Sequence, residues 1–166
     1  MVRQVGKIAF QGELGAYSHQ ACVAVYPDGE PIACKTFESA IATVNRGDAD
    51  VAMLPVENST YGRVADVHYL LPESGLHIIG EHFERVHINL LGVPGAKIED
   101  MTSAKSHTVL LGQCRKFLKE HNLLPVTGAD TAGSAQEVAA AGDKSQGALA
   151  GDLTAGIYGL DVLAQH

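Results

Sequence analysis

The polar tetrapeptide Glu57–Thr60 is the part of this sequence whose residue types and spacing are best suited to chemistry. It follows the stretch Asp50–Leu54, which is apolar after its first residue and which we expect to form a buried strand. We expect this strand to end in a polar turn at the tetrapeptide, with the next helix starting there. Open α/β sheets bind small ligands at such strand ends. The sequence therefore predicts a small-molecule site that holds its ligand with uncharged donors.

The residues of this turn also have structural explanations. A helix cap at Ser59 or Thr60 would account for both hydroxyl groups without any ligand. Glu57 and Asn58 are not needed for a cap that their neighbours already supply. We therefore weigh a ligand contact and an ordinary turn position equally for Glu57 and Asn58.

Ser106 and Gln113 form a second candidate pair, because seven residues at 3.6 per turn return nearly to the same helix face. A helix beginning at Ser106 would point both side chains the same way. The alternative is that Ser106 only caps the helix and that Gln113 is a solvated polar residue. Gln113 lies next to Cys114 near the apolar face, however, where a buried amide needs a hydrogen-bond partner.

The segment Gly12–Ser18 follows a predicted strand and opens a predicted helix. Its glycines permit a tight backbone turn, and free amide groups at a helix start attract carboxylate or phosphate. It is not a P-loop, since no Lys-Ser/Thr pair follows the second glycine. A plain strand–helix turn is the alternative. Further along the chain, Ser134 and Glu137 make a candidate capping box, and Lys105 lies at a predicted helix entrance as an anion contact or a solvated charge.

The composition of the 166-residue chain argues against several classes of partner. Its formal net charge of −7, its 5% aromatic residues and its lack of tryptophan argue against nucleic acid and anionic membranes. The three cysteines have no short spacing and indicate reduced core thiols of a cytosolic protein. No apolar run resembles a signal peptide or a membrane span. The eight histidines show no metal-binding spacing.

The order of the predicted elements indicates an α/β fold with mostly parallel sheets, because short apolar strands alternate with helices. Strands are expected over residues 7–11, 34–37, 51–54, 77–79, 89–93, 125–127, 146–150 and from 160 onward. Helices are expected over residues 18–26, 37–46, 63–71, 106–118 and 152–158. The region 77–91 is predicted to be rich in strands and to lack a helix. We interpret it as a pair of chain segments that cross between two lobes, with a cleft between the lobes. We place residues 1–80 and the C-terminal end in the first lobe, and residues 81–160 in the second.

Taken in order, these pieces resemble the prephenate dehydratase family. The matching segments cover most of the chain and read KIAFQGELGAYSHQA, FESAIATVNRGDADVAMLPVENSTYGRVADV, IIGEHFERVHINLL, KSHTVLLGQCRKFL, DTAGSAQEVA and GIYGLDVL. No single motif is decisive, but the ordered set is specific. The resemblance implies a two-lobed, periplasmic-binding-protein-like (type II) α/β fold with an inter-lobe cleft that holds the active site.

The resemblance also implies a reaction, the conversion of prephenate to phenylpyruvate with loss of carbon dioxide and water in phenylalanine biosynthesis. It implies no cofactor and no metal. We further expect a cytoplasmic location, from the composition and the lack of a signal peptide, and a homo-oligomer (dimer or tetramer). The catalytic residues that it implies are Asn58, Ser106 and Gln113. The substrate-binding residues that it implies are Gly15, Ala16, Tyr17, Glu57, Ser59, Thr131 and Ala132.

The chain departs from the family pattern at two places. The family usually has Ser-His-Pro-Gln where this chain has Ser106-His107-Thr108-Val109. The family's Thr-Arg-Phe motif, whose threonine is the favoured catalytic hydroxyl, and its regulatory ACT domain are expected beyond His166. We therefore expect a C-terminally truncated catalytic domain with little or no activity. The alternatives are an arogenate dehydratase and a non-catalytic, two-lobed module that binds small anions.

Overall fold

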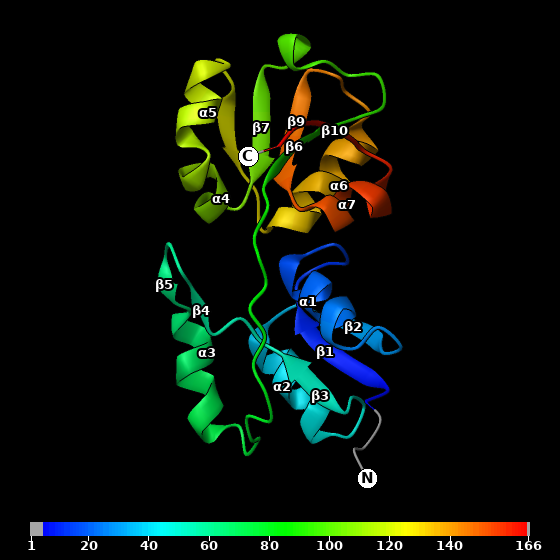
Figure 1. Cartoon of the computed structure of the whole chain (residues 1–166), viewed down its shortest axis with the longest axis vertical. Helices are drawn as coiled ribbons and strands as arrows, with labels where there is room; N and C mark the ends of the chain where they lie inside the picture. Colours follow the sequence, from blue (N-terminus) through cyan, green and yellow to red (C-terminus); the bar gives the residue numbers. More distant parts are fainter. Residues whose placement is uncertain (1–4, 166) are drawn as a thin grey trace. The chain divides into compact units, whose positions relative to one another are not determined.

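The computed structural model of the chain describes residues 5–165 (Figure 1). These residues form two compact units. Unit 1 contains the described residues up to Glu13 together with Tyr17–Glu84. Unit 2 contains the short segment Leu14–Ala16 together with the chain from Arg85 onward. We expected the C-terminal end in the first lobe, whereas the structure places it in unit 2.

Unit 1 is built on a three-stranded parallel sheet in the order β2-β1-β3. Its strands are β1 (Lys7–Gln11), β2 (Glu30–Cys34) and β3 (Val51–Met53). The helices α1 (Tyr17–Val25) and α2 (Phe37–Asn45) connect successive strands. The expected strand–helix alternation is therefore confirmed in this half of the chain, and parallel strands joined by helices are the standard way to cover both faces of such a sheet.

The central strand β1 is buried on both faces, because neighbouring side chains of a strand point to opposite sides. On one face Ile8 and Phe10 pack with Cys22 of α1. On the other face Ala9 packs with Cys34 and with residues of α2. The two predicted core cysteines of this unit therefore serve opposite faces of one sheet.

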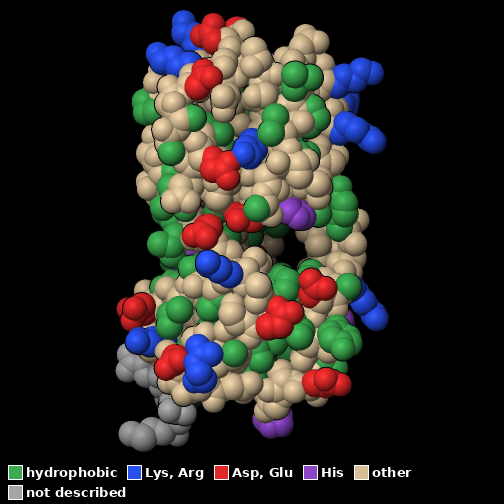
Figure 2. Space-filling model, turned by 180° about the vertical axis from the view of Figure 1, so that it is seen from behind, with side chains coloured by type: hydrophobic (Ala, Val, Ile, Leu, Met, Phe, Trp, Pro, Cys, Tyr) green, Lys and Arg blue, Asp and Glu red, His purple; other side chains and the backbone are tan. Residues whose placement is uncertain are grey.

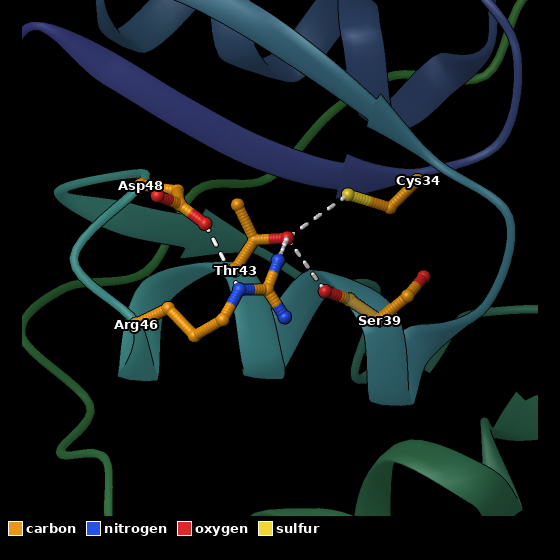
Figure 3. Close-up of polar contacts among 5 residues, drawn as sticks. All are labelled: Cys34, Ser39, Thr43, Arg46 and Asp48. Atoms are coloured by element: carbon orange, nitrogen blue, oxygen red, sulfur yellow. Dashed lines mark hydrogen bonds and ion pairs between the residues drawn. The ribbon is translucent and has the colours of Figure 1, made fainter.

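Polar contacts fix the two ends of α2. Thr36 and Ser39 form a capping box in front of the helix. At the other end the Thr43 hydroxyl donates to the Ser39 carbonyl (2.7 Å), and Arg46 donates to both the Thr43 hydroxyl (3.4 Å) and the Asp48 carboxylate (2.9 Å), as Figure 3 shows. These contacts tie the helix to the turn that leads into β3, so we assign them a structural role.

The polar turn after β3 forms a hairpin rather than a helix start. Its strands are β4 (Glu57–Asn58) and β5 (Gly62–Arg63), which pair in antiparallel fashion. The next helix, α3 (Ala65–Leu70), begins only afterwards and runs into the 3-10 turn η1 (Leu71–Glu73). The prediction that a helix starts in the polar turn is therefore wrong, because the chain folds back on itself first.

The expected strand at 77–79 is also wrong. Residues 75–88 contain neither helix nor strand. The side chains of Ile78 (76% exposed), Ile79 (74%) and Phe83 (87%) stand out into solvent. An apolar sequence without a pairing strand does not form a sheet, since the backbone hydrogen bonds of a strand come from its neighbours.

Unit 2 contains a five-stranded sheet in the order β10-β6-β9-β7-β8. Its strands are β6 (Asn89–Gly92), β7 (Ser103–Ser106), β8 (Leu124–Thr127), β9 (Gln146–Ala150) and β10 (Asp161–Gln165). Its helices are α4 (Thr108–Gln113), α5 (Arg115–Glu120), α6 (Thr131–Ala141) and α7 (Asp152–Tyr158), with the 3-10 turn η2 at Ile98–Asp100. In Figure 1, α4 and α5 lie on one side of this sheet and α6 and α7 on the other.

Only β6 runs against the other four strands of this sheet, because it is antiparallel to both β9 and β10. The prediction of an α/β fold with mostly parallel sheets is confirmed. The C-terminal strand β10 pairs with β6 and so completes the sheet of unit 2.

Candidate functional site

The candidate site in unit 2 lies where three parallel strands end. β7 ends at Ser106, β8 at Thr127 and β9 at Ala150, and Ser106 pairs directly with Thr127. The chain then continues from each strand into a helix, namely α4, α6 and α7. The carboxyl ends of parallel strands are where open α/β sheets place their ligands. This edge therefore brings together residues from three separate parts of the sequence.

Ser106 is the last residue of β7 and is fully buried. Its hydroxyl donates to the Leu149 carbonyl of β9 at 2.8 Å, so it joins two neighbouring strands. The cap of α4 is His107, whose Nδ1 accepts from the Val109 amide at 3.3 Å. The prediction that a helix begins at Ser106 is wrong, and the argument that Ser106 and Gln113 share one helix face falls with it.

Gln113 is the last residue of α4 and is half-buried. Among the described residues its side-chain amide has no hydrogen-bond partner. Lys105, by contrast, is engaged, because its ammonium group pairs with the Glu137 carboxylate. The cation before α4 is thus already paired, whereas the neutral amide at the C-terminal end of α4 is available.

The start of α6 is capped by Asp130, whose carboxylate accepts from the Gly133 amide at 2.6 Å. The predicted capping box of Ser134 and Glu137 is wrong: Ser134 lies inside the helix and donates to the Asp130 carbonyl. Thr131 is the first helical residue and is half-buried, with no side-chain partner among the described residues. Ala132 is fully buried, so its methyl group belongs to the core.

The glycine-rich segment after β1 contributes Gly15 and Ala16 to unit 2. The Thr154 hydroxyl of α7 donates to the Gly15 carbonyl at 2.8 Å, and the Tyr158 hydroxyl donates to the Leu14 carbonyl at 2.9 Å. Gly15 therefore lies against α7, the helix that follows β9. β9 pairs with β7, the strand that ends at Ser106. Tyr17 begins α1 and belongs to unit 1.

The remaining predicted site residues lie together in the β4–β5 hairpin of unit 1. The Asn58 side-chain oxygen accepts from the backbone amides of Thr60 (2.9 Å) and Tyr61 (3.0 Å), which is an Asx-type turn. The NH₂ group of Asn58 has no partner within the described part of the chain. Glu57 and Ser59 are exposed, and their side chains likewise have none there. The hairpin thus presents one carboxylate, one hydroxyl and one amide donor.

The titratable groups near these elements do not form an alternative catalytic centre. Burial raises the pKa of Cys22 to about 12 and that of Cys114 to about 11, so both thiols stay protonated and unreactive at neutral pH. Burial lowers the pKa of His19, which stacks on Phe10 in the core of unit 1. Within residues 5–165, no cluster of three or more metal-ligating side chains occurs. The groups that remain as candidates for substrate contacts are therefore mostly uncharged hydrogen-bond donors.

Acidic and basic side chains are interspersed over the face of the molecule that Figure 2 shows. That face carries no broad basic field of the kind that nucleic acid requires. A membrane-spanning helix is also absent from the described segments, since none is both long and apolar enough.

Sequence reasoning missed three residues that position the site. Asp130 had a local signal, because an aspartate placed three residues before a glycine amide at a helix start is a common cap. Thr154 and Tyr158 had none. Their partners are 139 and 144 residues away in the chain, so only the folded structure pairs them.

Comparison with known proteins supports one family for the whole chain. The family model described as "Prephenate dehydratase" matches residues 8–166. The chain is 46% identical over 159 residues to the bifunctional N-acyl-homoserine lactone acylase/prephenate dehydratase of Komagataeibacter europaeus, covering 96% of this chain and 57% of that protein. It is 40% identical over 160 residues to the arogenate dehydratase/prephenate dehydratase 1 of Arabidopsis thaliana, covering 96% of this chain and 41% of that protein.

A solved structure agrees with this assignment. The prephenate dehydratase of Arthrobacter aurescens, solved in complex with L-Phe, superimposes with a TM-score of 0.88 at 30% identity, covering 96% of this chain and 55% of that one. The chain thus spans about half the length of the relatives that it matches. The match extends through both units, and it agrees with the predicted fold class. The chain belongs to the prephenate dehydratase family.

Proposed function

We propose that this chain carries the catalytic residues that convert prephenate to phenylpyruvate, as a carbon–oxygen lyase. The observation that carries the proposal is the family match over residues 8–166, which includes the hairpin of unit 1 and the sheet edge of unit 2. Because the chain spans only part of its relatives, the activity belongs to our proposal for the longer protein, and we expect little activity from this segment by itself.

The chemistry needs no redox group. Prephenate carries two carboxylates; the bond from the ring to one of them breaks, its electrons enter the ring, and the ring hydroxyl leaves as water after taking up a proton. Aromatisation drives the reaction. The protein has to orient the ring, donate a hydrogen bond or a proton to the departing hydroxyl, and keep the departing carboxylate poorly solvated.

The available donors of the candidate site suit this task. The Asn58 NH₂ group, the Gln113 amide and the Thr131 hydroxyl are neutral and have no partner among the described residues. A strong cation would hold the departing carboxylate and slow its loss. Lys105, the cation at the helix entrance, is already paired with Glu137. Each well-placed neutral donor contributes roughly a hundredfold in rate.

The test is turnover of prephenate at neutral pH, followed by the absorbance of phenylpyruvate in alkali. The 166-residue chain and a version extended through the family's Thr-Arg-Phe motif are assayed side by side with the spontaneous reaction. We expect turnover above the spontaneous rate in the longer of the two and little in the segment alone. A protein that binds prephenate without turning it over in either form would be the non-catalytic anion-binding module instead.

Gln113→Ala sharpens this test. The Gln113 side chain has no hydrogen bond to lose within the described residues, so its removal leaves the melting temperature nearly unchanged. Turnover falls by roughly a hundredfold if the amide assists the reaction. Unchanged turnover in Gln113→Ala would remove this residue from the catalytic set without affecting the family assignment.

Arogenate is the second candidate substrate, because the Arabidopsis relative carries both dehydratase names. Arogenate has an amino group where prephenate has a keto group, so the two are compared as competing substrates by their kcat/KM values. N-acyl-homoserine lactone is included as a third substrate, because the Komagataeibacter relative carries an acylase name. Preference for arogenate would change the proposed substrate, and release of the acyl group as a carboxylic acid by hydrolysis of the amide bond would indicate an acylase instead.

A homo-oligomer is also part of this proposal. Its support is the exposed apolar side chains of Ile78, Ile79 and Phe83, which water solvates poorly.

A further inference from the structure

The segment Leu14–Ala16 is bound to unit 2 although the chain on either side of it belongs to unit 1. We propose that Thr154 and Tyr158 are positioning residues, which hold this segment against α7 and orient the Gly15–Ala16 peptide so that the Ala16 amide N–H meets a carboxylate of the substrate. The identity of that carboxylate rests on the proposed function above. The positioning of the segment by Thr154 and Tyr158 does not depend on the proposed function.

Two hydrogen bonds fix the segment. The Thr154 hydroxyl donates to the Gly15 carbonyl (2.8 Å), and the Tyr158 hydroxyl donates to the Leu14 carbonyl (2.9 Å). Thr154 is fully buried, so its hydroxyl needs this acceptor. The two donors lie one helical turn apart on α7, and therefore two consecutive carbonyl groups are tied to one face of the helix.

Close packing reinforces these bonds. Gly15 has a φ of +98°, and a Cβ atom at this position would lie 3.1 Å from the Thr154 Cα and 3.2 Å from its hydroxyl oxygen. Only glycine permits both this backbone conformation and this approach. Gly15 and Thr154 are thus matched in shape as well as in hydrogen bonding.

The direction of the Ala16 amide follows from the planarity of the peptide. None of the described peptide bonds is cis, and in a trans peptide the N–H points opposite to the preceding C=O. Because Thr154 holds the Gly15 carbonyl toward α7, the Ala16 N–H points away from α7. This N–H has no acceptor among the described residues. It lies just before α1, and amide groups at a helix start favour an anion.

The alternative is that these contacts only stabilise the fold. A purely structural hydrogen bond would change the stability of the whole protein when it is removed, with no particular effect on the segment or on substrate binding. The two roles are therefore separated by measurements that follow the segment itself.

The first experiment measures amide hydrogen exchange in the 166-residue chain. Thr154→Val keeps the shape of the side chain and removes its donor, and Thr154→Ser keeps the donor. In Thr154→Val we expect the amides of Gly15 and Tyr17, two residues that take part in further interactions, to exchange roughly five to ten times faster, since one neutral hydrogen bond that holds the segment is lost. In Thr154→Ser we expect exchange near the wild-type rate. Tyr158→Phe, expected to act like Thr154→Val, provides the test if Thr154→Val does not fold.

Thr102→Val is the matched control. The Thr102 hydroxyl also donates to a distant backbone carbonyl of unit 2, that of Ser145, at 3.2 Å. Its removal should leave exchange of residues 14–17 unchanged. Wild-type exchange of this segment in folded Thr154→Val or in Tyr158→Phe would overturn the inference, as would equal acceleration in Thr102→Val.

The second experiment measures turnover in a form of the protein that is active on prephenate. We expect Thr154→Val to raise the KM roughly fivefold to tenfold with a smaller change in kcat, and Thr154→Ser to restore it. An unchanged KM beside accelerated exchange would overturn the substrate contact of Ala16. A wild-type protein without turnover would refute the proposed function, while the exchange result still decides whether the segment is positioned by α7.

Discussion

At the scale of single residues, several side chains that the resemblance assigns to catalysis already have structural partners. The Asn58 oxygen holds the hairpin turn, and the Ser106 hydroxyl joins β7 to β9. A substitution at either position therefore alters the fold and the site together. The contributions of Asn58 to stability and to activity can be measured separately, because its oxygen holds the hairpin turn and its NH₂ group is the candidate donor to the substrate.

Asn58→Asp tests this separation. The carboxylate keeps an acceptor for the Thr60 and Tyr61 amides, so we expect the stability to change by less than about 0.5 kcal/mol. The NH₂ donor is lost and a negative charge replaces it, so we expect turnover of prephenate to fall roughly a hundredfold or more. Urea unfolding and the phenylpyruvate assay measure the two quantities.

Asn45→Asp is the control, because the Asn45 amide donates to the Ser74 carbonyl (3.0 Å) in the same unit and outside the candidate site. It should leave turnover unchanged. Full activity of Asn58→Asp would show that the amide donor of Asn58 has no part in the reaction.

His19 predicts a pH dependence of stability. Burial holds its pKa below the ordinary value of 6.5, so the unfolded chain takes up a proton more readily than the folded one. Its stabilising contribution is therefore complete above pH 6.5 and is lost as the pH falls below that value towards the lower pKa of the folded state. We expect wild type to lose more stability than His19→Gln between pH 7.5 and pH 5.5, both being measured by urea unfolding at each pH. Equal losses in the two proteins would contradict the assignment.

At the scale of elements, strands and helices with strong local patterns were predictable, and elements that depend on pairing were not. β1, β9 and α7 have the expected bounds, because their apolar periodicity and terminal glycines are local signals. The hairpin at Glu57–Arg63 and the break between α4 and α5 at Cys114 have no comparable signal. A two-residue strand pair is stabilised by its turn and by its surroundings, not by periodicity.

The cap of α6 predicts how much one side chain contributes to an element of the site. Asp130→Ala removes the acceptor of the Gly133 amide, and we expect a loss of about 1 kcal/mol of unfolding free energy. Asp130→Asn keeps the acceptor and should lose less. Urea unfolding monitored by circular dichroism measures both. A stability of Asp130→Ala equal to that of wild type would mean that water replaces this cap without cost.

At the scale of the whole molecule, two units with their own sheets are joined through short segments of chain. The segment Leu14–Ala16 belongs to unit 2, and residues 75–88 lead into unit 2 without regular structure. Each unit contributes its own group of candidate residues, the hairpin in unit 1 and the sheet edge in unit 2. A function that needs both groups therefore depends on both units being folded.

The exposed apolar side chains of Ile79 and Phe83 predict self-association. We expect the sedimentation coefficient of the 166-residue chain to rise with protein concentration, and Phe83→Ser to weaken this rise, because apolar surface is removed from the contact. Val23→Ser, at a 43% exposed position of α1, is the control and should change it little. If the sedimentation coefficient of Phe83→Ser rises with concentration as much as that of wild type, this surface does not mediate self-association.

The amino-acid sequence by itself determined the α/β class, the positions of most strands and helices, and the family, because these follow from local periodicity and from an ordered set of motifs. The tertiary structure decided how the candidate residues are held. Ser106 bonds to Leu149, Gly15 to Thr154 and Lys105 to Glu137 across 32 to 139 residues of chain. The physical reason is that a hydrogen bond depends on distance in space, and pairing of strands brings together residues that no spacing rule connects.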